Sequence, residues 1–470
     1  MTQVCRRLLL ILIAAVVTDS TGLSAEKPNI LFIVGDDMGY ADVGFHGCSD
    51  IPTPHLDALA AIGVQFTNGY VTGPYCSPTR AGLLTGRYQQ RFGHEFNPGG
   101  NEAGLPLGEK TIADHLKALG YQTSLVGKWH LGNDDAMHPQ QRGFDEFFGF
   151  LGGAHSFFNK QGILRGTQQV DDLDYTTDAF GREAVDFISR AKPDEPWFLY
   201  LSFNAVHTPM DATEDRLAKF AEIENKTRRT YAAMMSAMDD AIGSVLKKLD
   251  ETGQRNNTLV AFISDNGGPT MQGVTVNGSD NSPLRGSKRT TLEGGIRVPF
   301  VVSWNGTIKP KVVNYPVIQL DLTATALQLA GASDEVKSRL DGVDLLPYVS
   351  GEKSGAPHKA LFWRFGQQMA VRSGDFKLVK YDTNADHNRG DSRGVSALKL
   401  YNLAADIHEE KDLVSNMPDK VRELQALWDE WNSTNIDPLW GSGQAGSQEK
   451  KSEGGRKKGS RKNKAREKAD

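Results

Sequence analysis

The sequence predicts an α/β protein with a large, mostly parallel sheet sandwiched by helices, followed by a smaller α+β subdomain with an antiparallel sheet. Two observations lead to this prediction. Short apolar runs alternate with helical segments along most of the chain, as in parallel α/β domains. After about residue 345 the pattern changes to short β segments separated by turn signals. We therefore expect a main domain over residues 26–345 and a C-terminal subdomain over residues 346–440.

The main domain alternates strands and helices in chain order. The apolar runs that we interpret as buried strands cover residues 29–37, 121–130, 196–207, 257–268 and 298–304. The segments with helical spacing cover residues 53–66, 111–120, 178–191, 227–253 and 321–332. Gly63 is the expected stop of the first helix. Strands that are apolar throughout are typical of a parallel sheet buried on both faces.

The C-terminal part is predicted from three β segments and one helix. The β segments cover residues 360–366, 368–381 and 397–406, and residues 421–433 form the closing helix. From residue 441 the chain is rich in Gly, Ser and Lys and has very few apolar residues, so we predict a disordered basic tail over 441–470. This tail is either a solvated solubility segment or a tether to polyanionic glycans.

The net charge of −5 divides unevenly along the chain. The last 22 residues carry +6 and the remaining 448 carry −11. An acidic body argues against nucleic acid as the main partner. The 39% hydrophobic and 24% charged fractions are typical of a soluble globular protein and exclude a collagen-like or polytopic membrane protein.

The N-terminus predicts export. Arg6 and Arg7 precede an apolar run of ten residues, which is too short to span a bilayer but typical of a signal-peptide core. We predict a signal peptide over residues 1–25, a periplasmic or extracellular location, and no membrane span in the mature chain. A retained N-terminal anchor is the alternative. Glycosylation sequons occur at Asn225, Asn256, Asn277, Asn305 and Asn432.

Polar clusters follow four of the predicted strands. They are Asp36 and Asp37, Lys128 to His130, Asn204 to His207, and Asp265 with Asn266. Each cluster alone is compatible with a helix cap or a turn, but ligands of open parallel sheets bind at the carboxyl ends of strands. Carboxylate and amide oxygens suit a hard cation, and calcium tolerates irregular oxygen cages better than magnesium.

Two further segments carry candidate chemistry. Lys128 and His130 lie two residues apart, so on an extended segment both side chains can face one anionic group; an exposed Lys and a core His are the alternative. Cys76 lies in a loop rich in Gly, Pro and Ser that opens a probable helix, whose N-terminus favours anions. The alternative is that Cys76 is a small buried apolar residue, as a lone cysteine usually is. A disulfide between Cys48 and Cys76 is possible in principle, but the interpretation of Cys76 given below argues against it.

The stretch from Cys76 to Arg87 (CSPTRAGLLTGR) resembles the signature of type I, formylglycine-dependent sulfatases, an arylsulfatase-like family of the alkaline-phosphatase-like superfamily. Other segments similar to the family follow in family order: residues 29–39, 127–132, 204–209, 264–268, 284–297 and 401–413. The resemblance covers roughly residues 28–435 and implies an alkaline-phosphatase-like fold for the main domain.

The resemblance also implies a mechanism. A formylglycine-generating enzyme would oxidise Cys76 to Cα-formylglycine, whose hydrate is the nucleophile. One calcium ion would be held by Asp36, Asp37, Cys76, Asp265 and Asn266. The catalytic residues implied are Cys76, Arg80, Lys128, His130, His207 and Lys288. In this scheme Arg80 supports the hydrate and His130 orients it and assists sulfate release. The remaining cations and His207 bind sulfate or protonate the leaving oxygen.

The sequence therefore predicts an exported hydrolase of sulfate esters, with sulfated carbohydrates as substrates and aryl sulfates as model substrates. The alternatives are a phosphoester or phosphonate hydrolase with the same site and an inactive glycan-binding relative. Arg285 and Arg289 flank Lys288 and are interpreted as loop charges or substrate contacts. Specificity is assigned to loops 88–105, 133–165, 208–225 and 269–283. These loops carry or adjoin His94, Asn97, His138, Arg142 and His155, and loop histidines are expected to be exposed.

Overall fold

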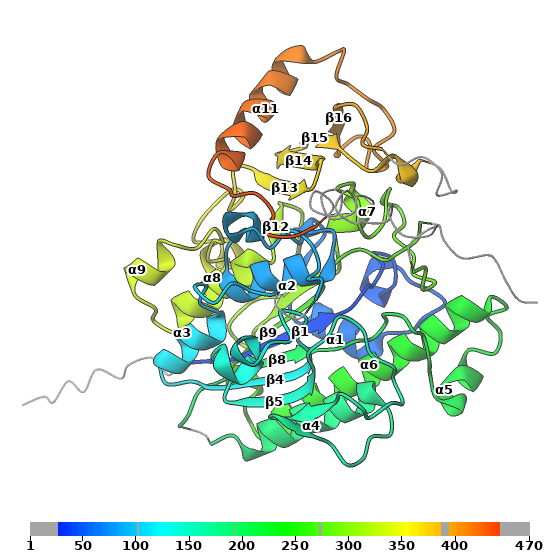
Figure 1. The fold of residues 1–470 in the computed structure, drawn as a ribbon, viewed down its shortest axis with the longest axis vertical. Helices are drawn as coiled ribbons and strands as arrows, with labels where there is room; N and C mark the ends of the chain where they lie inside the picture. The colour runs from blue at the N-terminus through cyan, green and yellow to red at the C-terminus, as the bar shows by residue number, and fades with distance from the viewer. Residues whose placement is uncertain (1–26, 101–102, 193, 272–274, 387–393, 442–470) are drawn as a thin grey trace, which may run out of the picture.

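The computed structural model describes residues 27–100, 103–192, 194–271, 275–386 and 394–441. Its main feature is one large sheet (Figure 1). In spatial order the sheet contains β11 (Lys311–Val313), β2 (Val64–Phe66), β10 (Phe300–Ser303), β9 (Thr258–Ser264), β1 (Asn29–Gly35), β8 (Trp197–Ser202), β4 (Gln122–Lys128), β5 (Glu146–Phe150), β6 (Leu164–Arg165) and β7 (Gln168–Gln169). The predicted mostly parallel sheet is confirmed, because β9, β1, β8, β4 and β5 all pair in parallel.

The register of the central strands aligns their carboxyl ends. Gly35, the last residue of β1, pairs with Ser264, the last residue of β9. In the same way Gly127 near the end of β4 pairs with Ser202 at the end of β8. Whatever follows these four strands therefore emerges along one edge of the sheet, where the side chains of distant segments can meet.

Helices cover both faces of the sheet (Figure 1). One layer contains α1 (Pro54–Ala61), α4 (Thr176–Arg190), α5 (Glu214–Lys219) and α6 (Lys226–Glu251). The other contains α2 (Cys76–Thr85), α3 (Ile112–Ala118) and α8 (Leu320–Leu329). Strand β1 shows why both layers are needed: Leu31 and Ile33 belong to the first apolar core, and Ile30 and Phe32 to the second.

Short elements complete the main domain. The paired strands β3 (Gly69–Tyr70) and β12 (Val317–Ile318) form a small separate sheet. The remaining short helices are α7 (Glu293–Ile296), α9 (Asp334–Lys337) and α10 (Leu346–Ser350), with 3-10 turns at Gly44–His46, Gln89–Phe92, Asp135–Met137, Pro139–Gln141, Arg255–Asn257 and Thr383–Ala385.

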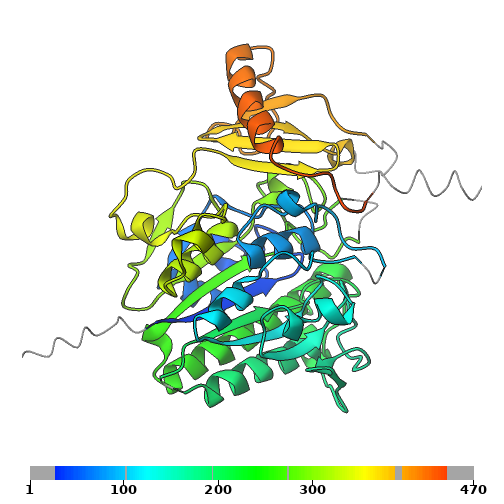
Figure 2. The ribbon, with the colours of Figure 1, turned by 60° about the vertical axis from the view of Figure 1, so that its left-hand side comes forward.

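The C-terminal sheet is antiparallel, as predicted. It contains β13 (Leu361–Phe365), β14 (Gln368–Ser373), β15 (Phe376–Lys380) and β16 (Lys399–Asn402). Helix α11 (Pro418–Asn432) covers one face, where Leu424 packs with Val371 and Leu378. The opposite face lies on the main domain through a core that includes Trp363 and Tyr70 (Figure 2).

Two segments show detail that the sequence did not predict. The helical spacing over residues 53–66 corresponds to α1, which ends at Ala61 just before the predicted stop at Gly63, and Val64–Phe66 forms strand β2 between β10 and β11. Gly63 sits so close to the sheet that an added Cβ would lie 2.7 Å from the carbonyl oxygen of Val302, which leaves no room for another helical turn. The predicted strand over residues 298–304 exists as β10, but it runs antiparallel to β9.

The predicted signal peptide lies outside the described residues, as does almost all of the predicted tail. Within the described part of the chain, no helix has the length and apolar character required to cross a bilayer.

Candidate functional site

The four predicted oxygen ligands meet at the carboxyl edge of the sheet. Asp36 and Asp37 follow β1, Asp265 and Asn266 follow the neighbouring strand β9, and all four side chains are buried. The backbone N–H of Asp37 donates to Asp265 Oδ1 at 3.2 Å, and Asn266 Nδ2 donates to Asp37 Oδ1 at 2.7 Å. Parallel pairing of β1 and β9 thus joins residues that are about 230 positions apart in sequence.

Each carboxylate of this cluster has its own cation. Lys128 Nζ, at the end of β4, lies 2.6 Å from Asp36 Oδ2. Lys288 Nζ lies 2.7 Å from the carboxylate of Asp37. Arg80, on α2, binds Asp265 Oδ2 through Nη2 at 2.8 Å and Nε at 3.0 Å. Burying an unpaired charge costs much free energy. Pairing each carboxylate with a cation lowers that cost, and this allows several ionised groups to lie together in the site.

The charges shift one another's ionisation. Burial alone would raise the pKa of Asp36, but Lys128, His207 and Arg80 outweigh it and hold that pKa well below its usual range. Burial, with the nearby charge of Asp36, raises the pKa of Asp265 to about 7. Burial opposes the charge of Lys288, yet Asp37 and its neighbours keep its pKa well above the ordinary value. The cluster is therefore a strongly polar, dry site.

Cys76 is the first residue of α2 and faces this cluster. Its Sγ and one ligand atom each of Asp36, Asp37 and His207 all lie within 4.8 Å of one another. The thiol is 1% exposed, and burial raises its pKa to about 12. An unmodified Cys76 is thus a protonated thiol at neutral pH and a weak nucleophile. Cys48 and Cys76 are both free, as the interpretation of Cys76 led us to expect.

Two oxygen atoms in the cluster have no hydrogen-bond partner within the part of the chain that the structure describes. They are Asp36 Oδ1 and Asn266 Oδ1, both fully buried. A buried acceptor without a donor is costly, and a cation bound between such oxygens would remove the cost. The donor set of carboxylates, an amide oxygen and the group at position 76 fits a hard divalent cation, with His207 also within reach.

The two histidines occupy different places. His207 Nδ1 donates to the backbone carbonyl of Thr208, and its Nε2 lies 3.5 Å from Asp37 Oδ2. His130 is buried and takes a left-handed φ of 60°, so the extended-chain argument that placed it beside Lys128 does not hold at this residue. Burial, followed by the charges of Lys128 and Arg80, lowers its pKa well below the ordinary value and keeps the ring neutral.

Some residues around the site were missed or misread from the sequence. Ser77 Oγ donates to the carbonyl of His130 at 2.6 Å and contacts His94 Nε2 at 2.6 Å, so His94 is buried, not exposed. Asn277, one of the sequon asparagines, is also buried and donates to the carbonyls of Asp37 and Val206 at 3.0 Å each. No local pattern distinguishes these polar loop residues, because only the folded loops bring their partners near.

The other predicted loop contacts have structural roles or lie at the rim. Arg142 is buried and donates to the carbonyls of Leu105, Pro106 and Glu109. Arg285 binds the hydroxyl of Tyr381 at 2.9 Å, the carboxylate of Asp386 and the carbonyl of Glu409, and so ties its loop to the C-terminal subdomain. Asn97 accepts from the Ser77 N–H, His138 is largely buried, and His155 is partly exposed.

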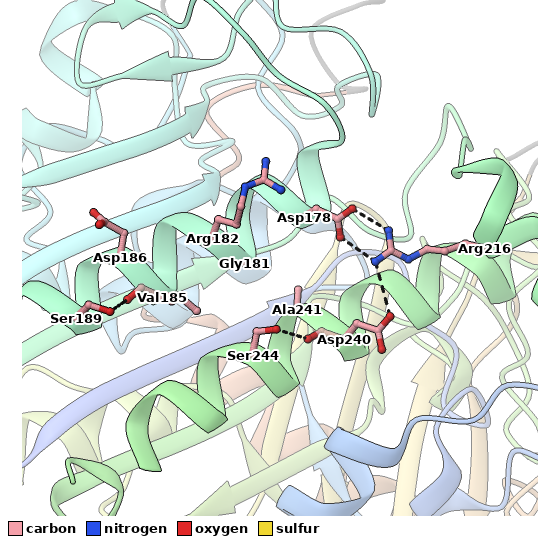
Figure 3. A pocket seen from close by; sticks show the side chains of 10 residues that line it. All are labelled: Asp178, Gly181, Arg182, Val185, Asp186, Ser189, Arg216, Asp240, Ala241 and Ser244. Carbon is pink, nitrogen blue, oxygen red and sulfur yellow. Dashed lines mark hydrogen bonds and ion pairs between the residues drawn. The ribbon is translucent and has the colours of Figure 1, made fainter. Parts of the chain in front are cut away.

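A surface groove of about 500 Å³ lies away from this chemistry, between α4 and α6 (Figure 3). One of the two arginines that line it, Arg216, binds both oxygens of Asp178 at 2.8 and 2.9 Å and lies 3.7 Å from Asp240. None of the candidate site residues lines this groove.

Comparison with known proteins identifies the family of this chain. The Sulfatase family model matches residues 28–332, which is more than half of the chain. The chain belongs to the sulfatase family. A second family model, described as N-sulphoglucosamine sulphohydrolase, C-terminal, matches residues 286–430 of the sulfatase. The predicted family and enzyme class are therefore confirmed.

Curated relatives agree with this membership. The sulfatase is 34% identical to Arylsulfatase J of Mus musculus over 87% of its own length and 77% of the relative's. It is 33% identical to N-acetylgalactosamine-6-sulfatase of Mus musculus, over 75% of its length and 72% of the relative's.

Solved structures share the fold. The crystal structure of Ps i-CgsB in complex with k-i-k-neocarrahexaose superposes with a TM-score of 0.82 at 35% identity, covering 92% of this sulfatase and 98% of that chain. The PsFucS1 sulfatase from Pseudoalteromonas sp. superposes with a TM-score of 0.77 at 27% identity, covering 87% and 92%.

Proposed function

We propose that this sulfatase hydrolyses sulfate esters of carbohydrates, consuming water and releasing sulfate and the free sugar hydroxyl, with position 76 as the nucleophile. One observation carries the proposal: Cys76 opens α2 beside the buried carboxylates, directly among Lys128, Lys288 and His207. This arrangement gathers a nucleophile, positive charge for an anionic ester, and a proton carrier in one dry pocket.

We assign Asp36, Asp37, Asp265, Asn266 and position 76 as the residues that hold one calcium ion. The unpartnered Oδ1 atoms of Asp36 and Asn266 support this assignment, since both are buried acceptors at the same sheet edge. A bound divalent cation supplies positive charge that polarises the sulfate oxygens. His207 Nε2 lies 3.5 Å from Asp37 Oδ2, so this histidine borders the assigned ion site.

We assign formylglycine, formed from Cys76 by a separate maturation enzyme, as the working form of position 76. The high pKa of the buried thiol supports a modified residue, because the unmodified side chain offers almost no thiolate. The hydrated aldehyde supplies a hydroxyl nucleophile without needing a thiolate.

The cations then have separate tasks. Lys128 and Lys288, each fixed by one carboxylate, present positive charge to the sulfate group. Arg80 holds Asp265 through two N–H groups and also reaches the hydroxyls of Tyr200 and Ser202, so it keeps the cluster rigid around position 76.

The two histidines carry protons. In His207 the Nδ1–H is committed to the Thr208 carbonyl, which leaves Nε2 as the atom that can give a proton to the leaving oxygen. His130 stays neutral, and its Nδ1 has no hydrogen-bond partner among the described residues, so this atom can accept a proton. Its ring packs against Gly153, where an added Cβ would lie 2.4 Å from Nε2.

The substrate class is proposed from relatives and from the predicted export. Ps i-CgsB binds k-i-k-neocarrahexaose, and another relative is an N-acetylgalactosamine-6-sulfatase. A signal peptide over residues 1–25 would place the enzyme in the periplasm or outside the cell, where sulfated polysaccharides are found.

Two measurements test the proposal. Mass spectrometry of the peptide carrying position 76, from protein isolated from its native host, should show formylglycine; active native protein with an unmodified cysteine would refute the nucleophile assignment. Sulfate release from sulfated oligosaccharides, a 4-nitrophenyl sulfate and the matching phosphate should favour the sulfates. Faster cleavage of the phosphate would favour a phosphoester hydrolase instead.

A further inference from the structure

We propose that Arg289, together with the ring of Tyr75, forms a subsite for a second sulfate group of the substrate, so that the enzyme prefers saccharides with a sulfate next to the ester it cleaves. The inference rests on the proposed function and names a finer substrate class for the same site.

The position of Arg289 places a cation at the mouth of the site. It directly follows Lys288, whose Nζ reaches Asp37 in the buried cluster. Lys288 Nζ lies 5.4 Å and the Arg289 guanidinium carbon 5.8 Å from the centre of the Tyr75 ring. Tyr75 directly precedes Cys76. One aromatic ring next to the nucleophile therefore contacts both a buried cation and an exposed one.

The guanidinium group of Arg289 has no ion-pair partner among the described residues. Arg80, Lys128 and Lys288 each bind a buried carboxylate, and Arg285 is engaged with the C-terminal subdomain. Arg289 is exposed, and over the described residues its side chain makes no ion pair and no hydrogen bond. Its five N–H donors are thus available to an anionic group that enters with the substrate.

The backbone of Arg289 is held in an unfavourable conformation. Its φ is 74°, in the left-handed region that a long side chain rarely adopts. The Arg289 N–H donates to the Pro74 carbonyl at 2.7 Å, and its carbonyl accepts from Gln368 Nε2 at 2.9 Å. Gln368 is a buried residue of β14, so both domains fix this loop. A strained, doubly fixed backbone directs an exposed side chain, which is more typical of a binding residue than of a loose surface charge.

The rim beside Arg289 also suits a sugar. Phe365, at the end of β13, packs edge to face with Tyr75 at 5.9 Å and lies 4.8 Å from Phe96. Tyr75 and Phe96 remain partly exposed. Aromatic faces of this kind pack against the apolar face of a sugar ring, while Arg289 binds a charged substituent and the buried cluster takes the reacting sulfate.

The test compares two oligosaccharides that differ only in a second sulfate beside the hydrolysed ester. The variant is Arg289→Asn, because Asn tolerates a positive φ and carries no charge. The control is Arg182→Gln on α4, since Arg182 is also exposed, with 59% of its side chain accessible, but lies in a helix layer away from Tyr75. The readout is the ratio of kcat/KM for the disulfated over the monosulfated sugar, measured at low salt.

We expect Arg289→Asn to lower this ratio by about ten-fold or more, as the loss of a charge-assisted contact does, while Arg289→Lys restores part of it. Arg182→Gln should keep the wild-type ratio. An Arg289→Asn ratio within about two-fold of wild type, or an equal loss on both sugars, would overturn the inference and leave the proposed function standing. A wild-type enzyme that cleaves the aryl sulfate and neither sugar would instead refute the carbohydrate assignment, and the subsite would fall with it.

Discussion

Lys377 should be one of the most sensitive positions for stability, although it lies far along the chain from the candidate site. It is a fully buried residue of β15, where the C-terminal sheet meets the main domain. Its Nζ donates to Glu293 Oε1 at 2.8 Å and forms an ion pair with Glu409 Oε1 at 2.9 Å. Both glutamates are themselves fully buried. We predict that Lys377→Met strongly destabilises the protein.

The size of this destabilisation follows from the two buried glutamates that remain after Lys377 is replaced. Glu293 keeps Arg297 at 3.3 Å and Arg372 at 4.0 Å, so it remains partly neutralised. Among the described residues, the Glu409 carboxylate keeps the hydrogen bond that it accepts from the Glu293 N–H. Removing one partner of a buried ion pair costs about 3–5 kcal/mol. The matched control is Lys399→Met on the adjacent strand β16, whose ion pair with Asp412 is one-third exposed and is worth about 0–1 kcal/mol.

The pH dependence has a definite sign. Burial raises the pKa of Glu409 to about 7 even with Lys377 present, and loss of the lysine raises it further. The folded state then holds a proton that the unfolded carboxyl, with a pKa of 4.5, gives up. Stability of Lys377→Met should therefore fall as pH rises from about 4.5 to above 7, by up to about 1.4 kcal/mol per pH unit.

Urea unfolding followed by tryptophan fluorescence measures these differences, because Trp363 and Trp431 lie in the core next to this cluster. Adding Glu409→Gln to Lys377→Met should raise the free energy of unfolding by about 2 kcal/mol and make it depend less on pH, since the unpaired carboxylate is gone. The reasoning is refuted if Lys377→Met and Lys399→Met lose the same free energy of unfolding, or if the Glu409→Gln addition destabilises further.

Three other predictions concern the candidate site. Cys76→Ala should lower sulfate release by about a thousand-fold or more while the urea midpoint changes little, and substantial residual turnover would contradict the nucleophile assignment. Chelation of divalent ions should abolish activity and calcium should restore it. Calcium at about 100 times its Kd should also stabilise the wild type by about 2.7 kcal/mol, an effect that Asp36→Asn should largely remove; equal stabilisation of both proteins would count against this ion site. Burial lowers the pKa of His94 to about 3, below the ordinary 6.5. Between these two pH values the unfolded state therefore binds a proton on His94 that the folded state does not bind. His94 should therefore contribute up to about 1.4 kcal/mol per pH unit to the fall of wild-type stability below about pH 6.5, and the slope of His94→Gln in urea titrations should be smaller by that amount; parallel curves would show that His94 is not buried as a neutral ring.

Much of the fold was predictable because the signals are local. The continuous apolar runs of β1, β4, β8 and β9 identify buried strands without knowledge of their neighbours. Polar residues directly after such strands point to one sheet edge, and the structure brings Asp36, Lys128 and Asp265 together there. Their catalytic and metal-binding roles remain predictions.

Other features depend on contacts that no local pattern contains. Residues 64–66 leave the helical pattern because β10 and β11 offer free edges to pair with. His94 is buried, and its Nε2 contacts the hydroxyl of Ser77 on α2. The rim of the site includes Phe365, which lies in the C-terminal subdomain 290 residues beyond Tyr75.

The family, most of the strand and helix segments and the residue types at the sheet edge were predictable, since apolar runs and the Cys76–Arg87 signature are properties of neighbouring residues. The folded structure was needed to show which carboxylate each cation binds, that Lys377 bridges two buried glutamates, and that Arg289, beside Tyr75, has no ion-pair partner among the described residues. The physical reason is that the energy of a buried charge depends on every group packed around it, and those groups come from distant parts of the chain.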